Sequence, residues 1–175
     1  SIYLMDDMTV EAIADGIHVP PTILRLIYKV KGVEKTALIT DALACAASDS
    51  KNSYHPRVNI EAGLCKLEDA AASDSKVAFD PRVIIEDGVC KLADRSALAG
   101  SIATMDRLIQ TMTFKAEVPL FDVCRMISET PAKIMGVYDR KGSLERGKDA
   151  DILLLDKNLD VRAVWAMGKL VKNFE

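Results

Sequence analysis

The chain has 175 residues, of which 49% are hydrophobic and 28% charged, with a net charge of −3 and four cysteines. This length suffices for one core but falls short of the ~250 residues of a closed (β/α)8 barrel. The charges form no basic stripe with interleaved aromatics, and no apolar run approaches a membrane span, so we expect no nucleic-acid or membrane partner. The cysteines show no Cys-x-x-Cys spacing, which favours a reduced, cytoplasmic protein.

The first part of the chain predicts a βαβ unit. Residues 11–14 predict a short strand, and Pro20-Pro21 opens a helix because proline is tolerated in the first helical turn. Gly32 ends this helix, and residues 36–40 predict the next strand. This order predicts two parallel strands joined by a helix over residues 10–41. The apolar face of the helix is predicted to comprise Ile23, Leu24, Leu26, Ile27 and Val30.

The middle of the chain contains an internal duplication. Residues 46–69 and 71–94 align without gaps at an offset of 25, and sixteen of the 24 aligned positions are identical. Each copy predicts a β-hairpin. In the second copy, Asp87-Gly88 between β-prone runs favours a two-residue turn with positive φ at both positions. The first copy has Ala62-Gly63 at that turn, so we interpret it as the extra, relaxed copy.

The last part of the chain predicts helices and then strands. Apolar spacing predicts helices at about 102–112, 119–128 and 131–136. Strands are predicted at 152–155, 162–165 and 169–172. We expect these tail strands to pair with the duplicated hairpins in one small sheet. They follow a charged turn over residues 142–151, in which two glycines stand five positions apart.

Two residues stand where chemistry is expected in a parallel α/β fold. His18 and Asp41 both follow predicted strands, at the strand ends where reactive residues gather, so we expect them to share one cleft. An aspartate there can act as a general base toward a metal-bound water, and a nearby histidine can fix the substrate. Position alone favours a turn or helix-capping aspartate and a hydrogen-bonded loop histidine. Only two histidines exist, and His55 corresponds to Asp80 in the second copy, so the residues themselves predict no zinc cage.

Five segments occur in a characteristic order. They are Ala-Asp-Gly-Ile-His-Val at 14–19, Thr-Asp-Ala at 40–42, Leu-Ala-Gly-Ser at 98–101 with Thr104-Met105, Pro131-Ala132, and the string at 142–156. Together they resemble the N-acetylglucosamine-6-phosphate deacetylase family of the amidohydrolase superfamily. The last string is shared more widely among amidohydrolases, and the first three segments narrow the resemblance.

The resemblance implies a metal-dependent (β/α)8 barrel with a small β-sandwich, of which this chain would form the C-terminal part. The implied reaction is hydrolysis of the acetamide of N-acetylglucosamine-6-phosphate to glucosamine-6-phosphate and acetate. Asp41 would be the catalytic aspartate that activates metal-bound water and then protonates the leaving amine. Substrate contacts would come from Asp15, Gly16, Ile17, His18, Leu98, Ala99 and Gly100.

The chain also departs from the family pattern. The family's metal ligands, a glutamate and two histidines, would lie upstream of residue 14, and nothing here corresponds to them. We therefore expect a divalent metal such as zinc in the full enzyme and none in this chain alone. The expected partners are an amino-sugar phosphate and either a second copy of the chain or a missing N-terminal half. A non-catalytic remnant, a folding or oligomerisation unit, or a portion of another amidohydrolase is the alternative.

The expected organisation has four segments. They are a barrel βαβ segment at 1–45, the hairpin insert at 46–96, barrel helices at 97–140 and a small β domain at 141–175.

Overall fold

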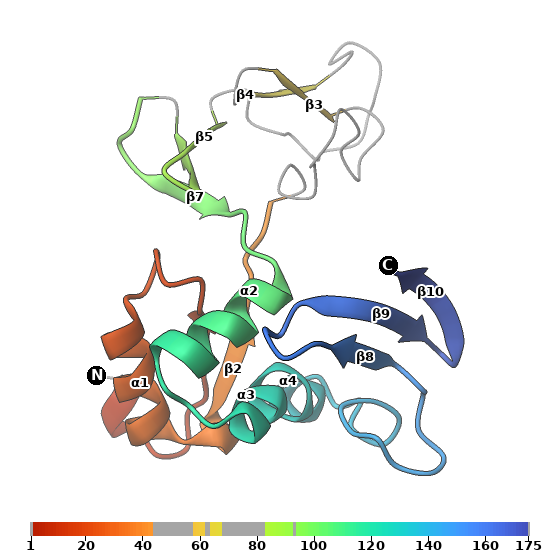
Figure 1. Ribbon diagram of the computed structural model, residues 1–175. Helices are drawn as coiled ribbons and strands as arrows, with labels where there is room; N and C mark the ends of the chain where they lie inside the picture. Colours follow the sequence, from red (N-terminus) through yellow and green to blue (C-terminus); the bar gives the residue numbers. More distant parts are fainter. Residues whose placement is uncertain (1, 44–57, 62–63, 68–82, 93, 175) are drawn as a thin grey trace. The chain divides into compact units, whose positions relative to one another are not determined.

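The computed structural model describes residues 2–43, 58–61, 64–67, 83–92 and 94–174. It divides into two compact units (Figure 1). The first unit comprises Ser1–Ile39 and Met105–Glu175, and the second comprises Thr40–Thr104. Each unit is described by itself below.

The first unit begins with the predicted βαβ arrangement. Strands β1 (Val10–Ile13) and β2 (Thr36–Ile39) pair in parallel, with Val10 opposite Thr36. Helix α1 (Pro21–Lys31) connects them through the 3-10 turn η2 (Val33–Lys35), and a further 3-10 turn, η1 (Ile2–Leu4), precedes β1. The prediction of two parallel strands joined by a helix over residues 10–41 is confirmed.

The apolar face of α1 is narrower than predicted. Leu24 and Ile27 are buried, whereas Ile23, Leu26 and Val30 are exposed. Within this unit, α1 contacts β2, the 111–115 segment and the 3-10 turns η1 and η2. The predicted face therefore includes residues that take no part in the core of this unit.

Three helices follow in the same unit. Helix α2 (Met105–Gln110) continues into the π-helical turn η4 (Thr111–Lys115), and α3 (Leu120–Ile127) and α4 (Glu129–Ile134) come next. Helices α1, α3 and α4 all contact β2 (Figure 1). The core of the unit contains Leu24, Leu38, Leu108, Ile109, Met112, Val123 and Met126. No described helix is long and apolar enough to cross a membrane.

The tail forms a separate sheet within the first unit. Strands β8 (Ile152–Leu155), β9 (Val161–Ala166) and β10 (Lys169–Asn173) are antiparallel in the order β10-β9-β8. The predicted tail strands are confirmed, but their predicted pairing with the hairpins is wrong for the described residues. Short turns bring successive tail strands together, and pairing through a short loop loses less chain entropy than pairing with a distant segment.

The second unit contains both copies of the duplicated hairpin. Its strands are β3 (Val58–Glu61), β4 (Leu64–Leu67), β5 (Val83–Glu86), β6 (Val89–Leu92) and β7 (Leu98–Ser101). They form one antiparallel sheet in chain order, β3-β4-β5-β6-β7. Asp87 and Gly88 have φ values of 55° and 78°, as the turn prediction requires. The corresponding turn of the first copy, Ala62-Gly63, lies outside the described residues, as do His55 and Asp80.

Strand β7 was not predicted. The helix expected from residue 102 begins instead at Met105, because Leu98–Ser101 pairs with β6. Val83 and Cys90 form the centre of a small core in this unit, against which Leu43, Ile85, Ala99 and Ile102 pack. This core fixes the position of β7 beside the residues that follow β2 in the chain.

Candidate functional site

The loop after β1 is built around one buried carboxylate. The Asp15 side chain is fully buried, and its Oδ1 accepts hydrogen bonds from the backbone N–H groups of Ile17 and His18, both at 2.9 Å. Its Oδ2 lies 2.8 Å from His18 Nδ1. A single side chain therefore fixes both the backbone of this loop and the orientation of the His18 ring.

These hydrogen bonds keep Asp15 ionised. Burial disfavours the charged carboxylate, but the hydrogen bonds from Ile17 and His18 outweigh it and hold the pKa of Asp15 below its usual value. An ionised carboxylate only accepts hydrogen bonds, so His18 Nδ1 carries the hydrogen between them. The other ring nitrogen, Nε2, is consequently the one available to another group.

His18 Nε2 has no hydrogen-bond partner within the described part of the chain, although it is buried. The side chain as a whole is 9% exposed. Most buried polar atoms in proteins are hydrogen-bonded, so an unpaired ring nitrogen calls for an explanation. The hydroxyls of Thr36 and Thr113 share this state, but neither is held in a fixed orientation by a buried carboxylate.

Asp41 lies in the second unit, against strand β7. Its side chain is exposed, and its backbone has a φ of 48°, which an aspartate adopts less readily than a glycine. The Asp41 carbonyl accepts a hydrogen bond from Ser101 N–H at 2.9 Å, and Ala42 forms a parallel bridge with Ser101. The structure thus brings Asp41 together with the predicted Leu-Ala-Gly-Ser segment.

Gly100 is required by this close approach. Its φ is 115°, and an added Cβ would lie 3.0 Å from Leu43 Cγ and 3.2 Å from the Asp41 carbonyl oxygen. Leu98 is exposed, and Ala99 packs against the small core. Whatever contact Gly100 makes with a substrate, its lack of a side chain also lets β7 approach Asp41.

The predicted site residues fall into two groups. Asp15, Gly16, Ile17 and His18 form one loop of the first unit, in which Ile17 is 42% exposed. Asp41, Leu98, Ala99 and Gly100 lie together in the second unit. A single cleft containing both His18 and Asp41 stays a prediction.

The residues present do not fit a metal centre. Among the described residues, no three side chains of histidine, cysteine, aspartate or glutamate gather closely enough to hold an ion. A catalytic zinc site usually takes three protein ligands. Within the part of the chain that the structure describes, Asp41 is therefore a carboxylate without a set of co-ligands around it.

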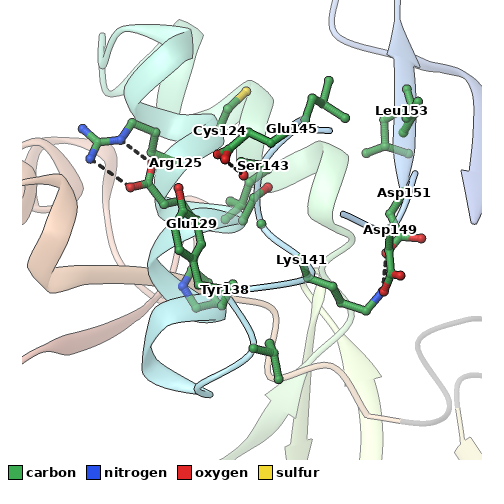
Figure 2. Close-up of a pocket in the computed structure, with 18 of the residues that line it drawn as sticks. Cys124, Arg125, Glu129, Tyr138, Lys141, Ser143, Glu145, Asp149, Asp151 and Leu153 are labelled. Atoms are coloured by element: carbon green, nitrogen blue, oxygen red, sulfur yellow. Dashed lines mark hydrogen bonds and ion pairs between the residues drawn. The ribbon is translucent and has the colours of Figure 1, made fainter. Parts of the chain in front are cut away.

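The first unit also contains a large hollow, which the Asp15–His18 loop does not line. It has a volume of about 1230 Å³ and is lined by α3, α4, the 137–151 segment, β8 and β9. Its charges pair with one another: Arg125 Nε lies 2.8 Å from Glu129, and Lys141 Nζ lies 3.0 Å from Asp149 (Figure 2). Arg125 and Lys133 hold the pKa of Glu129 at about 2. The predicted site residues do not line this hollow.

The charged string at 142–151 forms one wall of the hollow and has a structural role. A Cβ added at Gly142, whose φ is 86°, would lie 2.7 Å from Ala132 Cβ. The Lys148 ammonium lies 3.5 Å from the centre of the Tyr138 ring and 2.7 Å from Ser143 Oγ. Asp151 accepts a hydrogen bond from Met167 N–H at 2.8 Å. The string therefore joins α4 to the turn between β9 and β10.

One positioning contact was not predicted from the sequence. Asp15 is fully buried, and its side chain accepts hydrogen bonds from Ile17 and His18 of its own loop. Its sugar contact stays a prediction. The spacing Asp-x-x-His carried a usable signal, because aspartate side chains often accept hydrogen bonds from backbone groups two or three residues later.

Comparisons with known proteins cover nearly the whole chain. The model of the amidohydrolase family matches residues 2–171. An N-acetylglucosamine-6-phosphate deacetylase of Bacillus subtilis is 30% identical over 167 residues, which are 94% of this chain and 36% of that protein. A putative N-acetylgalactosamine-6-phosphate deacetylase of Escherichia coli K12 is 31% identical, over 91% of this chain and 81% of its own length.

A solved structure adds a likeness in fold. It is an aspartate-to-alanine variant of the N-acetyl-D-glucosamine-6-phosphate deacetylase of Mycobacterium smegmatis, in complex with N-acetyl-D-glucosamine-6-phosphate. The TM-score is 0.72 at 29% identity, covering 97% of this chain and 39% of that one. The chain thus spans little more than a third of the Bacillus and Mycobacterium proteins.

Proposed function

Because this chain belongs to the amidohydrolase family, we propose that it is the C-terminal portion of a metal-dependent deacetylase. The reaction is hydrolysis of the acetamide of N-acetylglucosamine-6-phosphate to glucosamine-6-phosphate and acetate. The observation that carries the proposal is the likeness, over 94% of this chain, to a deacetylase with that substrate in its name. In this proposal the chain is part of a (β/α)8 barrel with a small β-sandwich, and residues outside it hold the divalent metal.

His18 binds the sugar in this proposal. Asp15 accepts the hydrogen bond from Nδ1–H, so Nε2 is the ring nitrogen left to form a hydrogen bond with a sugar hydroxyl. Both Asp15 oxygens already accept hydrogen bonds within the loop, so Asp15 acts through His18 as a positioning residue. The carboxylate thus sets which ring nitrogen faces the ligand.

Asp41 moves protons in this proposal. Its carboxylate is exposed while its backbone is fixed against Ser101, which suits a group that must reach a substrate in one orientation. As a general base it takes a proton from the attacking water, and as a general acid it delivers that proton to the leaving amine. Such transfer contributes about 10²- to 10⁴-fold to the rate.

Acetate release tests this assignment. The chain is joined to the N-terminal portion of the Bacillus subtilis relative, and turnover of N-acetylglucosamine-6-phosphate is measured with added zinc. We expect the joined protein to be active and Asp41→Asn to lower its turnover by at least about 100-fold. Asp6→Asn makes the same chemical change at an exposed residue near η1 and should leave turnover unchanged.

Two results would contradict the assignment. One is robust acetate release by the isolated 175-residue chain, because the residues described here form no metal centre. The other is an Asp41→Asn protein as active as the Asp6→Asn control. A joined protein that folds and releases no acetate from either amino-sugar phosphate would favour the non-catalytic alternative.

N-acetylgalactosamine-6-phosphate is a second candidate substrate. The relative from Escherichia coli K12, of which the chain covers 81%, is named for that sugar. The two sugars differ only in the orientation of one hydroxyl, so the same site chemistry serves both. The ratio of kcat/KM for the two substrates in the joined protein decides between them.

A further inference from the structure

Ser101 is buried completely, and its bonds converge on one short segment. The backbone N–H of Ser101 donates to the Asp41 carbonyl at 2.9 Å, and its carbonyl accepts from Leu43 N–H at 3.0 Å. Its Oγ donates to the Thr40 carbonyl. A single residue of β7 therefore bonds to three of the four residues from Thr40 to Leu43.

The hydroxyl also has a second bond that fixes its direction. Ala103 N–H donates to Ser101 Oγ at 3.0 Å, so the oxygen accepts from one side and donates to the other. A hydroxyl with both partners in place cannot rotate freely. The Thr40 carbonyl, which immediately precedes Asp41, is thereby tied to the residues that lead into α2.

Asp41 needs such support because of its backbone. Its φ of 48° lies in the left-handed region, which a non-glycine residue keeps only where surrounding contacts impose it. The Ser101 bonds supply these contacts. Gly100 permits them, because a Cβ added there would lie 3.2 Å from the Asp41 carbonyl oxygen. Strained backbone of this kind is often associated with residues that must be held in one orientation.

We propose that Ser101 is a positioning residue that holds Thr40 and Asp41 so that the Asp41 carboxylate keeps one direction. This inference rests on the proposed role of Asp41 as the proton-transferring group. The hydroxyl of Ser101 itself touches no substrate. Its effect on catalysis passes entirely through the backbone of Asp41.

The first test is hydrogen exchange in the 175-residue chain, which needs no activity. Ser101→Ala keeps the backbone N–H and carbonyl and removes only the two Oγ bonds. We expect exchange of the Ala103 and Leu43 amides to accelerate at least about tenfold, while the β5–β6 amides stay protected. Ser96→Ala is the matched control, because Ser96 lies in the same unit and its Oγ donates to the exposed neighbouring Asp94.

The second test is kinetic and uses the joined protein. Ser101→Ala should lower kcat by about 10- to 100-fold with little change in KM, since displacing a reacting group by about 1 Å costs rate on that order. In an Asp41→Asn background the same change should have no further effect, because Ser101 acts only through Asp41. Gly100→Ala displaces Asp41 from the other side and should lower kcat as well.

The outcomes separate the two proposals. Unchanged amide exchange, loss of β5–β6 protection, or accelerated exchange with unchanged kcat each overturns the role of Ser101. An additive effect of Ser101→Ala and Asp41→Asn overturns it too. An Asp41→Asn protein with full turnover instead overturns the proposed function, whatever the exchange experiment shows about Ser101.

Discussion

Two loops of the first unit use similar residues in opposite ways. The loop from Asp15 to His18 places one carboxylate inside the protein, where it orients a histidine ring and leaves one ring nitrogen without a partner among the described residues. The string at 142–151 distributes its charges near the surface. Within it, Lys148 bonds to Ser143 and Asp151 to Met167. Lys141, the residue before the string, pairs with Asp149.

The difference separates a loop that keeps an unpaired polar atom, among the described residues, from a segment that connects two elements. The 142–151 string is the more extended of the two motifs, and its contacts at Gly142 and Asp151 connect α4 with the tail sheet. In the shorter loop, from Asp15 to His18, the buried Nε2 of His18 has no hydrogen-bond partner among the described residues. Unsatisfied hydrogen-bonding capacity, rather than motif length, marks the candidate for ligand contact.

The largest expected effect tests whether the 142–151 string is a close-fitting joint. Gly142→Ala forces a side chain into left-handed backbone and against Ala132 and the Ser128 carbonyl, so we expect a loss of about 3 kcal/mol in the free energy of unfolding. The control is Gly147→Ala, with a φ of 97° and no atom within 4 Å of the added Cβ. It should cost only about 1 kcal/mol. Trp165, the single tryptophan, lies in β9 and reports the unfolding of this unit.

The next effect tests the buried carboxylate of the other loop. Asp15→Ala removes the acceptor of three hydrogen bonds, and we expect it to lower the free energy of unfolding by about 2 kcal/mol. Asp15→Asn should cost less, because an amide oxygen still accepts from both backbone N–H groups. Its amide N–H₂ faces His18 Nδ1, however, so the hydrogen moves to Nε2. The ¹⁵N shifts of the His18 ring would reveal this exchange of tautomers.

The pH dependence of stability checks the same loop. The pKa of Asp15 is lower in the folded protein than its ordinary value of 3.8, so the stability that its charge contributes is present above that pH. It is lost as the pH falls through the folded pKa. The stability difference between the wild-type protein and Asp15→Asn should therefore be constant near neutral pH and shrink below about pH 4. A difference that grows on acidification would contradict the assignment of an ionised Asp15.

The smallest effect is expected from the ion pairs that Lys141, the residue immediately before the 142–151 string, makes with that string. Lys141→Met removes the ion pairs with Asp149 and Asp151, which are partly exposed and screened by water and salt. The free energy of unfolding should change less than in any variant above, and the change should shrink further at 1 M salt. A loss as large as that of Gly142→Ala would show that charge, rather than fit, holds the joint.

Sequence patterns predicted the positions of helices, strands and turns better than they predicted which strands pair with each other. Helix α1 and the Asp87-Gly88 turn follow from local rules about proline, glycine and apolar spacing. The pairing of the tail strands did not follow, because any exposed strand edge satisfies the same pattern. Strand β7 was missed because Leu-Ala-Gly-Ser has weak strand propensity and depends on its neighbours, β6 and the segment after β2.

The internal geometry of the candidate site did not follow from the sequence. The sequence proposed His18 and Asp41 from their places after predicted strands and from the resemblance, and their roles stay predictions. The burial of Asp15 and the bonds of Ser101 depend on where the chain folds back, and no pattern in the sequence reports that distance. Asp41 and Gly100 are 59 positions apart in the chain, with the whole duplication between them. Their contact is a product of tertiary structure alone.

The strand order of the second unit has a consequence for how this chain can change in length. The added hairpin joins the sheet at the side of β3 and β4, whereas β7, which holds Asp41 in place, lies at the opposite edge. A repeat of this kind contributes two strands at a time, so each new copy leaves the antiparallel alternation of the others intact. Tandem duplication therefore adds strands at the edge of the sheet that lies farthest from β7. Copy number can drift in this gene while the residues around Asp41 keep their places.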